Sequence, residues 1–119
     1  MSTITKVLAV MTAIEFLYIM YLETFATTSD KTASVFHMKE EELQRTSVNT
    51  LFKNQGIYNG LLAVMILLAV FAFASKTAVI VLMVYIIAVA LYGSFTSNPK
   101  IILMQGGIAI LTLVSCFVL

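Results

Sequence analysis

The chain has little of what soluble enzymes commonly use for chemistry. Its 119 residues include one cysteine, one proline, one histidine and no tryptophan. The lone cysteine, Cys116, excludes an internal disulfide, a CxxC pair and a zinc site built from cysteines. With only His37 available, neither a haem pair nor a Ser-His-Asp set can be assembled, and no glycine-rich phosphate loop is present. We therefore expect no catalytic set, no metal site and no cofactor. Enzymatic activity stays open, with a non-enzymatic role favoured.

Charged residues are also scarce. They make up 11% of the chain, against 61% hydrophobic residues, whereas a soluble domain carries about 25% charged residues. The formal net charge of +1 gives no field that would attract nucleic acid. A chain this short has too little interior to hide so much apolar surface from water. The sequence therefore predicts a multi-pass protein of the cell membrane, with the lipid bilayer as its partner.

Four apolar runs are long enough to cross a bilayer, which takes about 20 helical residues. The predicted spans are residues 4–25, 56–74, 77–95 and 101–119. Short connections between the later spans make neighbouring helices antiparallel. The predicted fold is all-α: one integral membrane domain over residues 1–119, with four transmembrane helices in an antiparallel bundle.

The first connection, residues 26–55, is much longer than the others. Residues 27–30 have loop composition, and the acidic run 40–42 suits the first turn of a helix. Apolar residues at helical spacing then predict a helix running from about residue 39 directly into the second span, as a helical extension of that span in the first loop. Near the other end of the chain, Pro99 is predicted to start the fourth helix.

The basic residues predict an orientation. The first loop carries Lys31, Lys39, Arg45 and Lys53, and the third carries Lys100. The positive-inside rule therefore favours loops one and three in the cytoplasm, with both termini outside.

Acidic residues inside the first span are the strongest functional signal. Glu15 lies in the middle of this span and Glu23 near its end. A carboxylate at bilayer depth costs about 2.5–3.5 kcal/mol on insertion scales. On an α-helix the two lie about 80° apart, so they can border one cavity without touching. Glu15 is interpreted as a proton- or cation-binding acid or as a structural carboxyl, and Glu23 as a site residue or as a solvated interfacial acid.

Uncharged polar residues accompany these acids in the other spans. Within residues 54–60 the i, i+4 spacing repeats three times: Asn54 with Tyr58, Gln55 with Asn59, and Gly56 with Gly60. The polar pairs form a ridge, and the glycines allow close approach of another helix. Tyr92 in the third span and Gln105 in the fourth complete the set. The ridge either faces a pocket or holds helices together, and Tyr92 is either a site residue or an interfacial anchor.

These residues favour a protein that binds or transports a polar or cationic small molecule, proton-coupled through Glu15. The predicted ligand- or proton-binding residues are Glu15, Glu23, Asn54, Gln55, Tyr58, Asn59, Tyr92 and Gln105. One alternative is a membrane-embedded, cofactor-independent, isomerase-like enzyme acting on a lipid-soluble substrate; another is a structural subunit. Four helices leave little room for a cavity, so a homodimer is a further hypothesis.

The same motifs carry a family resemblance over nearly the whole chain. Residues 15–25, residues 54–60, Tyr92-Gly93 and residues 105–109 together resemble the family catalogued as domain of unknown function 1304. The resemblance implies a small four-span membrane protein of a kind found in bacteria and fungi, with no settled activity. The family often has His where this chain has Phe16, and Pro where it has Ile108. A looser likeness is to small multidrug resistance transporters, whose tight first loop and tryptophan motifs do not occur here.

Overall fold

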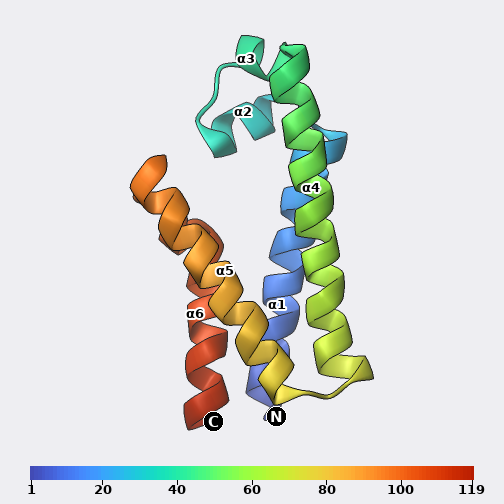
Figure 1. The fold of residues 1–119 in the computed structure, drawn as a ribbon, viewed down its shortest axis with the longest axis vertical. Coiled ribbons are helices and arrows are strands. Elements are labelled where there is room, and N and C mark those ends of the chain that lie inside the picture. The colour runs from blue at the N-terminus through green and yellow to red at the C-terminus, as the bar shows by residue number, and fades with distance from the viewer. The chain divides into compact units, whose positions relative to one another are not determined.

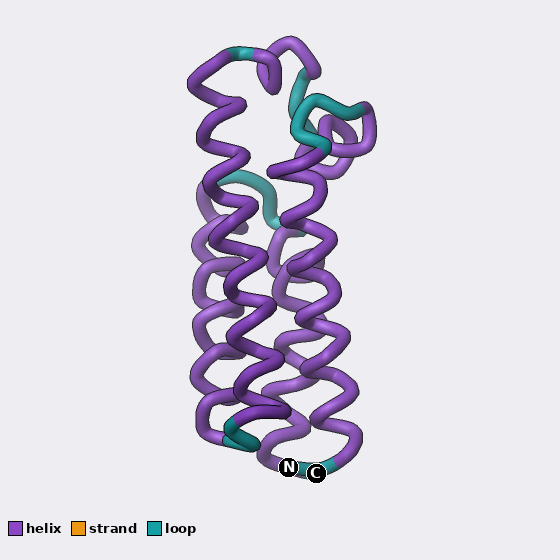
Figure 2. Tube along the Cα trace, turned by 90° about the vertical axis from the view of Figure 1, so that its right-hand side faces the viewer, coloured by secondary structure: helices purple, strands orange, loops and turns teal.

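Helices account for nearly all of the chain. A computed structural model describes residues 1–119, and its trace is helical apart from short turns (Figure 2). Four helical stretches are long and apolar enough to cross a membrane: Thr3–Phe25, Thr46–Ala72, Lys76–Thr96 and Ile101–Val118. The predicted fold class is therefore confirmed, with an all-helical chain and four helices that suggest a multi-pass membrane protein.

The helices follow one another with few loop residues. In chain order they are α1 (Thr3–Met20), the π-helical turn η1 (Tyr21–Phe25), α2 (Asp30–Phe36), α3 (Glu40–Gln44), α4 (Thr46–Leu67), the π-helical turn η2 (Leu68–Ala72), α5 (Lys76–Thr96) and α6 (Ile101–Val118). They form two compact units. Unit 1 comprises residues 1–15 and 64–119, and unit 2 comprises residues 16–63.

Unit 1 is built on α5 and α6, which run side by side (Figure 1). Its buried apolar side chains include Val79, Met83 and Ile86 of α5 and Ala109 of α6. The beginning of α1 joins the end of α6, and both chain termini lie at the same end of this unit (Figure 1). Unit 1 is thus a helix assembly with a buried apolar core contributed by α5 and α6.

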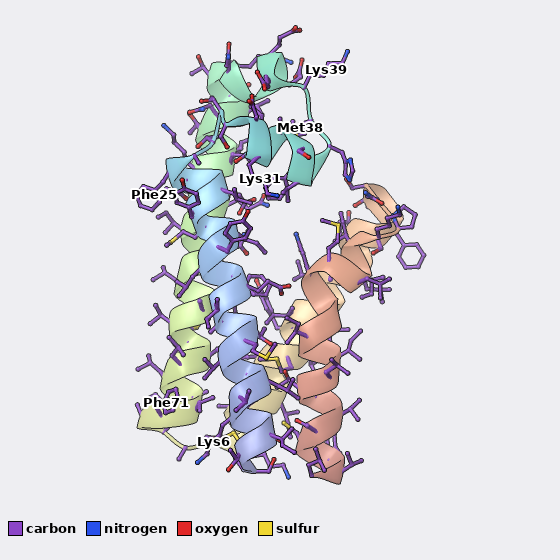
Figure 3. All side chains as sticks on the ribbon, turned by 180° about the vertical axis from the view of Figure 1, so that it is seen from behind. Lys6, Phe25, Lys31, Met38, Lys39 and Phe71 are labelled. Carbon is purple, nitrogen blue, oxygen red and sulfur yellow. The ribbon has the colours of Figure 1, made fainter.

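Unit 2 is an antiparallel pair made by the end of the first span and the beginning of α4. Thr24 donates a hydrogen bond to the backbone oxygen of Lys53 at 2.9 Å. The short helices α2 and α3 connect the pair, and the Phe36 ring meets the Phe52 ring edge-on, with centroids 5.3 Å apart. Phe25, the last residue of η1, points outward (Figure 3). The first loop therefore folds as part of unit 2.

The predicted continuous helix from residue 39 into the second span is wrong in one respect. A helix does begin at Glu40, with three acidic residues in its first turn. It ends at Gln44, because Arg45 has an extended backbone (φ −65°, ψ 134°), and α4 starts afresh at Thr46. The break accompanies full burial of Leu43, whose carbonyl accepts a hydrogen bond from Asn49 at 3.2 Å. The extension of span two into the loop is real, but it begins after this kink.

Two smaller expectations also change. The region read as loop at residues 27–30 leads directly into a helix at Asp30, which Ser29 caps by accepting the Thr32 backbone N–H. Pro99 does not start the fourth helix, which begins at Ile101. Pro99 instead lies in a turn, closed by hydrogen bonds from the backbone nitrogens of Lys100 and Ile101 to Asn98.

Candidate functional site

The Glu23 carboxyl is the most enclosed acidic group of unit 2. Its residue is 0% exposed. Gln55 Nε2 donates to Oε2 at 2.7 Å, and Asn59 Nδ2 donates to Oε1 at 2.6 Å. Gln55 and Asn59 are one turn apart on α4, so their amides reach the same carboxyl from one helix face. Both oxygens of the acid are thereby bound by amide donors.

A π-helical turn carries Glu23 into this position. The turn spans Tyr21–Phe25 and is marked by the bond from the Ala26 backbone nitrogen to the Tyr21 oxygen at 2.9 Å. Such a wide turn is rare and occurs frequently at functional sites. It changes the angular position of Glu23 relative to a regular α-helix, so the separation expected from α-helical spacing does not apply to this residue.

Glycines on α4 allow the two helices of unit 2 to approach closely. A Cβ placed on Gly56 would stand 3.0 Å from the Thr24 backbone nitrogen and 3.1 Å from Glu23 Cβ, in addition to striking the Thr24 hydroxyl. A Cβ on Gly60 would strike the Met20 sulfur. The predicted glycine groove is therefore occupied by the first span, directly beside the Glu23 carboxyl.

Hydroxyl groups satisfy the backbone carbonyls that the wide turn leaves free. Thr27 Oγ1 donates to the Glu23 carbonyl at 2.6 Å. Thr32 Oγ1 lies 3.0 Å from the Leu22 oxygen and 2.7 Å from the Ala26 oxygen. Thr27 and Thr32 are both buried. Sequence reasoning missed them, although threonines just after a span that contains an acid are a usable signal.

Glu15 has a different environment, at the boundary of unit 1. Its Oε1 is buried and has no hydrogen-bond partner. Gln105, the amide of the fourth span in the same unit, is half-buried and forms no bond with it. The structure therefore supplies amide partners to Glu23 and none to Glu15, although the sequence favours Glu15 as the proton-exchanging acid.

The remaining candidates lie on the surface. Tyr58 is 77% exposed and Tyr92 is 71% exposed, and the Asn54 side chain is exposed as well. Of the eight sequence-predicted residues, the structure brings together Glu23, Gln55 and Asn59. Tyr85 of the third span is also exposed.

A second polar feature, in unit 1, was not anticipated. Thr5 and Ser115 hydroxyls lie 2.9 Å apart, and Thr12 and Thr112 hydroxyls lie 3.4 Å apart. All four residues are buried. They join α1 to α6, and because each threonine of the second pair also donates to its own helix backbone, they are best explained as packing contacts. No group of three or more His, Cys, Asp or Glu residues is arranged to hold a metal ion.

Comparisons with known proteins give a family and a near relative. A family model described as "Protein of unknown function (DUF1304)" matches residues 10–117. The chain is 57% identical over 118 residues to the "Uncharacterized protein YpaA" of Lactococcus lactis subsp. lactis (strain IL1403), an alignment covering 98% of this chain and 99% of the relative. No solved structure matches the chain. The chain therefore belongs to the DUF1304 family of proteins of unknown function, as its motifs predicted.

Proposed function

We propose that this protein is a single integral membrane domain that binds or transports a polar or cationic small molecule in exchange for a proton. The observation that carries the proposal is the Glu23 carboxyl, fully buried within a candidate span and bound by Gln55 and Asn59. Ionisable groups inside membrane spans are expensive, and they commonly mark substrate and proton pathways.

The chemistry of the cluster favours a cation with hydrogen-bond donors. Each amide uses an N–H on Glu23, which leaves the carbonyl oxygens of Gln55 and Asn59 available as acceptors. Together with the carboxylate, these oxygens form an anionic and dipolar set suited to an ammonium group. Because Glu23 is buried, an occupant reaches it only after covering side chains, among them the exposed Gln55, move aside.

Glu15 has a secondary role in this proposal. A buried carboxyl oxygen without a partner is costly, and Glu15 Oε1 is such an atom. We interpret Glu15 as a second proton acceptor that serves the same exchange. A role of Tyr58, Asn54, Tyr92 and Gln105 in ligand binding stays a prediction, as does pairing of two copies.

The test is proton release on binding. Purified protein in nanodiscs, in weakly buffered solution with a pH dye, is titrated with ammonium, tetramethylammonium and tetraphenylphosphonium. We expect wild-type protein to release protons with at least one of these probes. Glu23→Gln should abolish the release, because an amide has no proton to exchange, and Glu15→Gln should reduce it.

The matched control is Glu41→Gln, which removes an exposed acid outside the four candidate spans and should leave the release unchanged. Circular dichroism checks that every variant keeps its helices. Release from Glu23→Gln equal to that of wild type would contradict the proposal, as would wild-type protein that releases no proton with any of the three cations.

A further inference from the structure

The end of the first span is tied to the first loop by two threonine hydroxyls. A helix end leaves several carbonyls without an intrahelical donor, and at membrane depth such groups must be satisfied within the protein. In unit 2 the carbonyl of Glu23 itself accepts a hydrogen bond from Thr27 Oγ1 at 2.6 Å. The hydroxyl of Thr32 is shared between the neighbouring carbonyls of Leu22, at 3.0 Å, and Ala26, at 2.7 Å.

The two threonines come from different parts of the loop. Thr27 lies in the turn just after η1, whereas Thr32 lies in the first turn of α2. Thr32 is held in place by Ser29, whose hydroxyl accepts its backbone N–H at 3.2 Å and lies 3.0 Å from its Oγ1. The position of α2 is therefore linked through one buried side chain to the backbone that carries Glu23.

We propose that Thr27 and Thr32 are positioning residues that hold the wide turn open and so keep the Glu23 carboxyl on the Gln55 and Asn59 amides. Without these hydroxyls, the free carbonyls of residues 22 and 23 favour a return to regular α-helical bonding. That return rotates Glu23 away from α4. On the other side of the turn, a Cβ on Gly56 would stand 3.1 Å from Glu23 Cβ, so the turn lies directly against α4 and a rotation of Glu23 would break this contact.

This inference rests on the proposed function in taking Glu23 as the acid that exchanges protons, and it predicts that the first loop regulates that acid. A displacement of α2 would be transmitted through Thr32 to the turn.

The test follows the Glu23 carboxyl directly. Its infrared carboxyl band is identified as the difference between wild type and Glu23→Gln, and is recorded across a pH series in nanodiscs. Thr32→Val and Thr27→Val keep the side-chain shape and remove the hydroxyl. Both should displace the Glu23 band and shift the pH at which it titrates. Thr32→Ser, which keeps the hydroxyl, should restore the wild-type band.

The matched control is Thr28→Val, because Thr28 is exposed and its hydroxyl makes no hydrogen bond within the chain. If Thr27→Val and Thr32→Val both give the wild-type band and the wild-type titration, the proposal is overturned. A purely structural role predicts lower stability with an unmoved Glu23 band, and that result also overturns it.

A measurement on the unaltered protein covers the case in which the valine variants do not fold. NMR of wild-type protein should detect slowly exchanging hydroxyl protons on Thr27 and Thr32, in contact with the carbonyls of Glu23 and Leu22 respectively. Rapidly exchanging hydroxyls would overturn the proposal. If Thr27→Val and Thr32→Val shift the Glu23 band while no cation releases protons from wild type, the proposed function fails and the positioning role of the two threonines stands.

Discussion

At the scale of single residues, the acid and its amides depend on one another. Burying an ionisable carboxyl without partners is strongly unfavourable, and Glu23 is 0% exposed. A typical hydrogen bond contributes about 0.5–1.5 kcal/mol, and leaving a buried polar group unsatisfied costs about 1–3 kcal/mol. The amides of Gln55 and Asn59 are thus the side chains that make burial of Glu23 tolerable.

Deleting either amide should therefore destabilise the protein. We expect Asn59→Leu and Gln55→Leu each to lower the free energy of unfolding by about 1–3 kcal/mol, measured by reversible unfolding in mixed micelles. In a Glu23→Leu background the same substitutions should lower the free energy of unfolding much less, because the acid that the amides bind is absent.

Asn54→Leu is the control for this cycle, since Asn54 is exposed on the same helix as Gln55 but its side chain makes no hydrogen bond within the chain. It should change stability by no more than about 0.5 kcal/mol. Equal losses in the wild-type and Glu23→Leu backgrounds would mean that the amides act independently of the acid.

The sequence predicts that Glu23, Gln55 and Asn59 are site residues, but it does not predict which acid the two amides bind. The i, i+4 spacing of Gln55 and Asn59 is local information, and it correctly predicts that both amides lie on one face. Position in the sequence favours Glu15 as the proton-exchanging acid, because a mid-span carboxylate is the more expensive one. The choice of Glu23 depends on how α4 aligns with the end of the first span and on the π-helical turn at Tyr21–Phe25, and neither is encoded in residue spacing.

At the scale of elements, close contact between the first span and α4 depends on Gly56. Gly56→Ala should lower stability by about 1–3 kcal/mol, because the added methyl overpacks against Thr24 and the Glu23 side chain. Gly107→Ala on α6 is the matched control. No atom lies within 4 Å of a Cβ built there, so the helix propensity of alanine should leave stability unchanged or raise it by up to about 1 kcal/mol. Thermal unfolding measures both variants. A lower stability of Gly107→Ala than of Gly56→Ala would contradict this packing.

The short helices of the first loop should respond to pH. A hydrogen bond that the protonated Glu40 carboxyl donates to Asp30, together with the negative charge of Asp30, raises the pKa of Glu40 above its ordinary value of 4.5. An acid whose pKa is raised by folding contributes stability below its unfolded pKa, and that contribution is lost as pH rises through the folded value. Opening of α2 and α3, followed by hydrogen exchange corrected for the intrinsic rate, should therefore become easier as pH increases above 4.5.

Glu40→Gln should flatten this dependence, because it removes the titrating group, while Glu41→Gln should preserve it. A pH profile in Glu40→Gln that coincides with the wild-type profile would remove the Asp30–Glu40 contact from the explanation.

The short helices α2 and α3 are only partly predictable from sequence patterns. Acidic residues at 40–42 predict the start of α3, because the effect of the helix dipole is local. The end of α3 at Gln44 and the helix at Asp30–Phe36 follow from burial of Leu43 and Thr32 within unit 2. Such burial is set by tertiary contacts, which hydrophobic periodicity in a short loop does not specify.

At the scale of the whole molecule, four candidate spans suggest a chain that crosses a membrane repeatedly. These spans are predictable because length and apolar composition are properties of each segment alone. Their ends agree with the sequence prediction to within a few residues, apart from the start of α4 at Thr46. Which spans share a polar contact is not predictable in this way, because it depends on side chains meeting across segments far apart in the chain.

Orientation is a testable property at this scale. The basic residues of the first loop predict that it faces the cytoplasm. In a background with Cys116→Ser, a cysteine at Ser34 should be labelled by a membrane-impermeant maleimide only after the cells are permeabilised. A cysteine at Ser2 should be labelled in intact cells. The reverse pattern would place the first loop outside and would contradict the predicted orientation.

The central claim is that an acid of the first span is held inside the protein by amides of α4. The most direct measurement is solid-state NMR of bilayer-embedded protein, with the Glu23 carboxyl carbon and the side-chain nitrogens of Gln55 and Asn59 labelled. The account predicts close through-space coupling of the carboxyl carbon to both nitrogens. A Glu23 carboxyl that couples to water and to neither amide would contradict it.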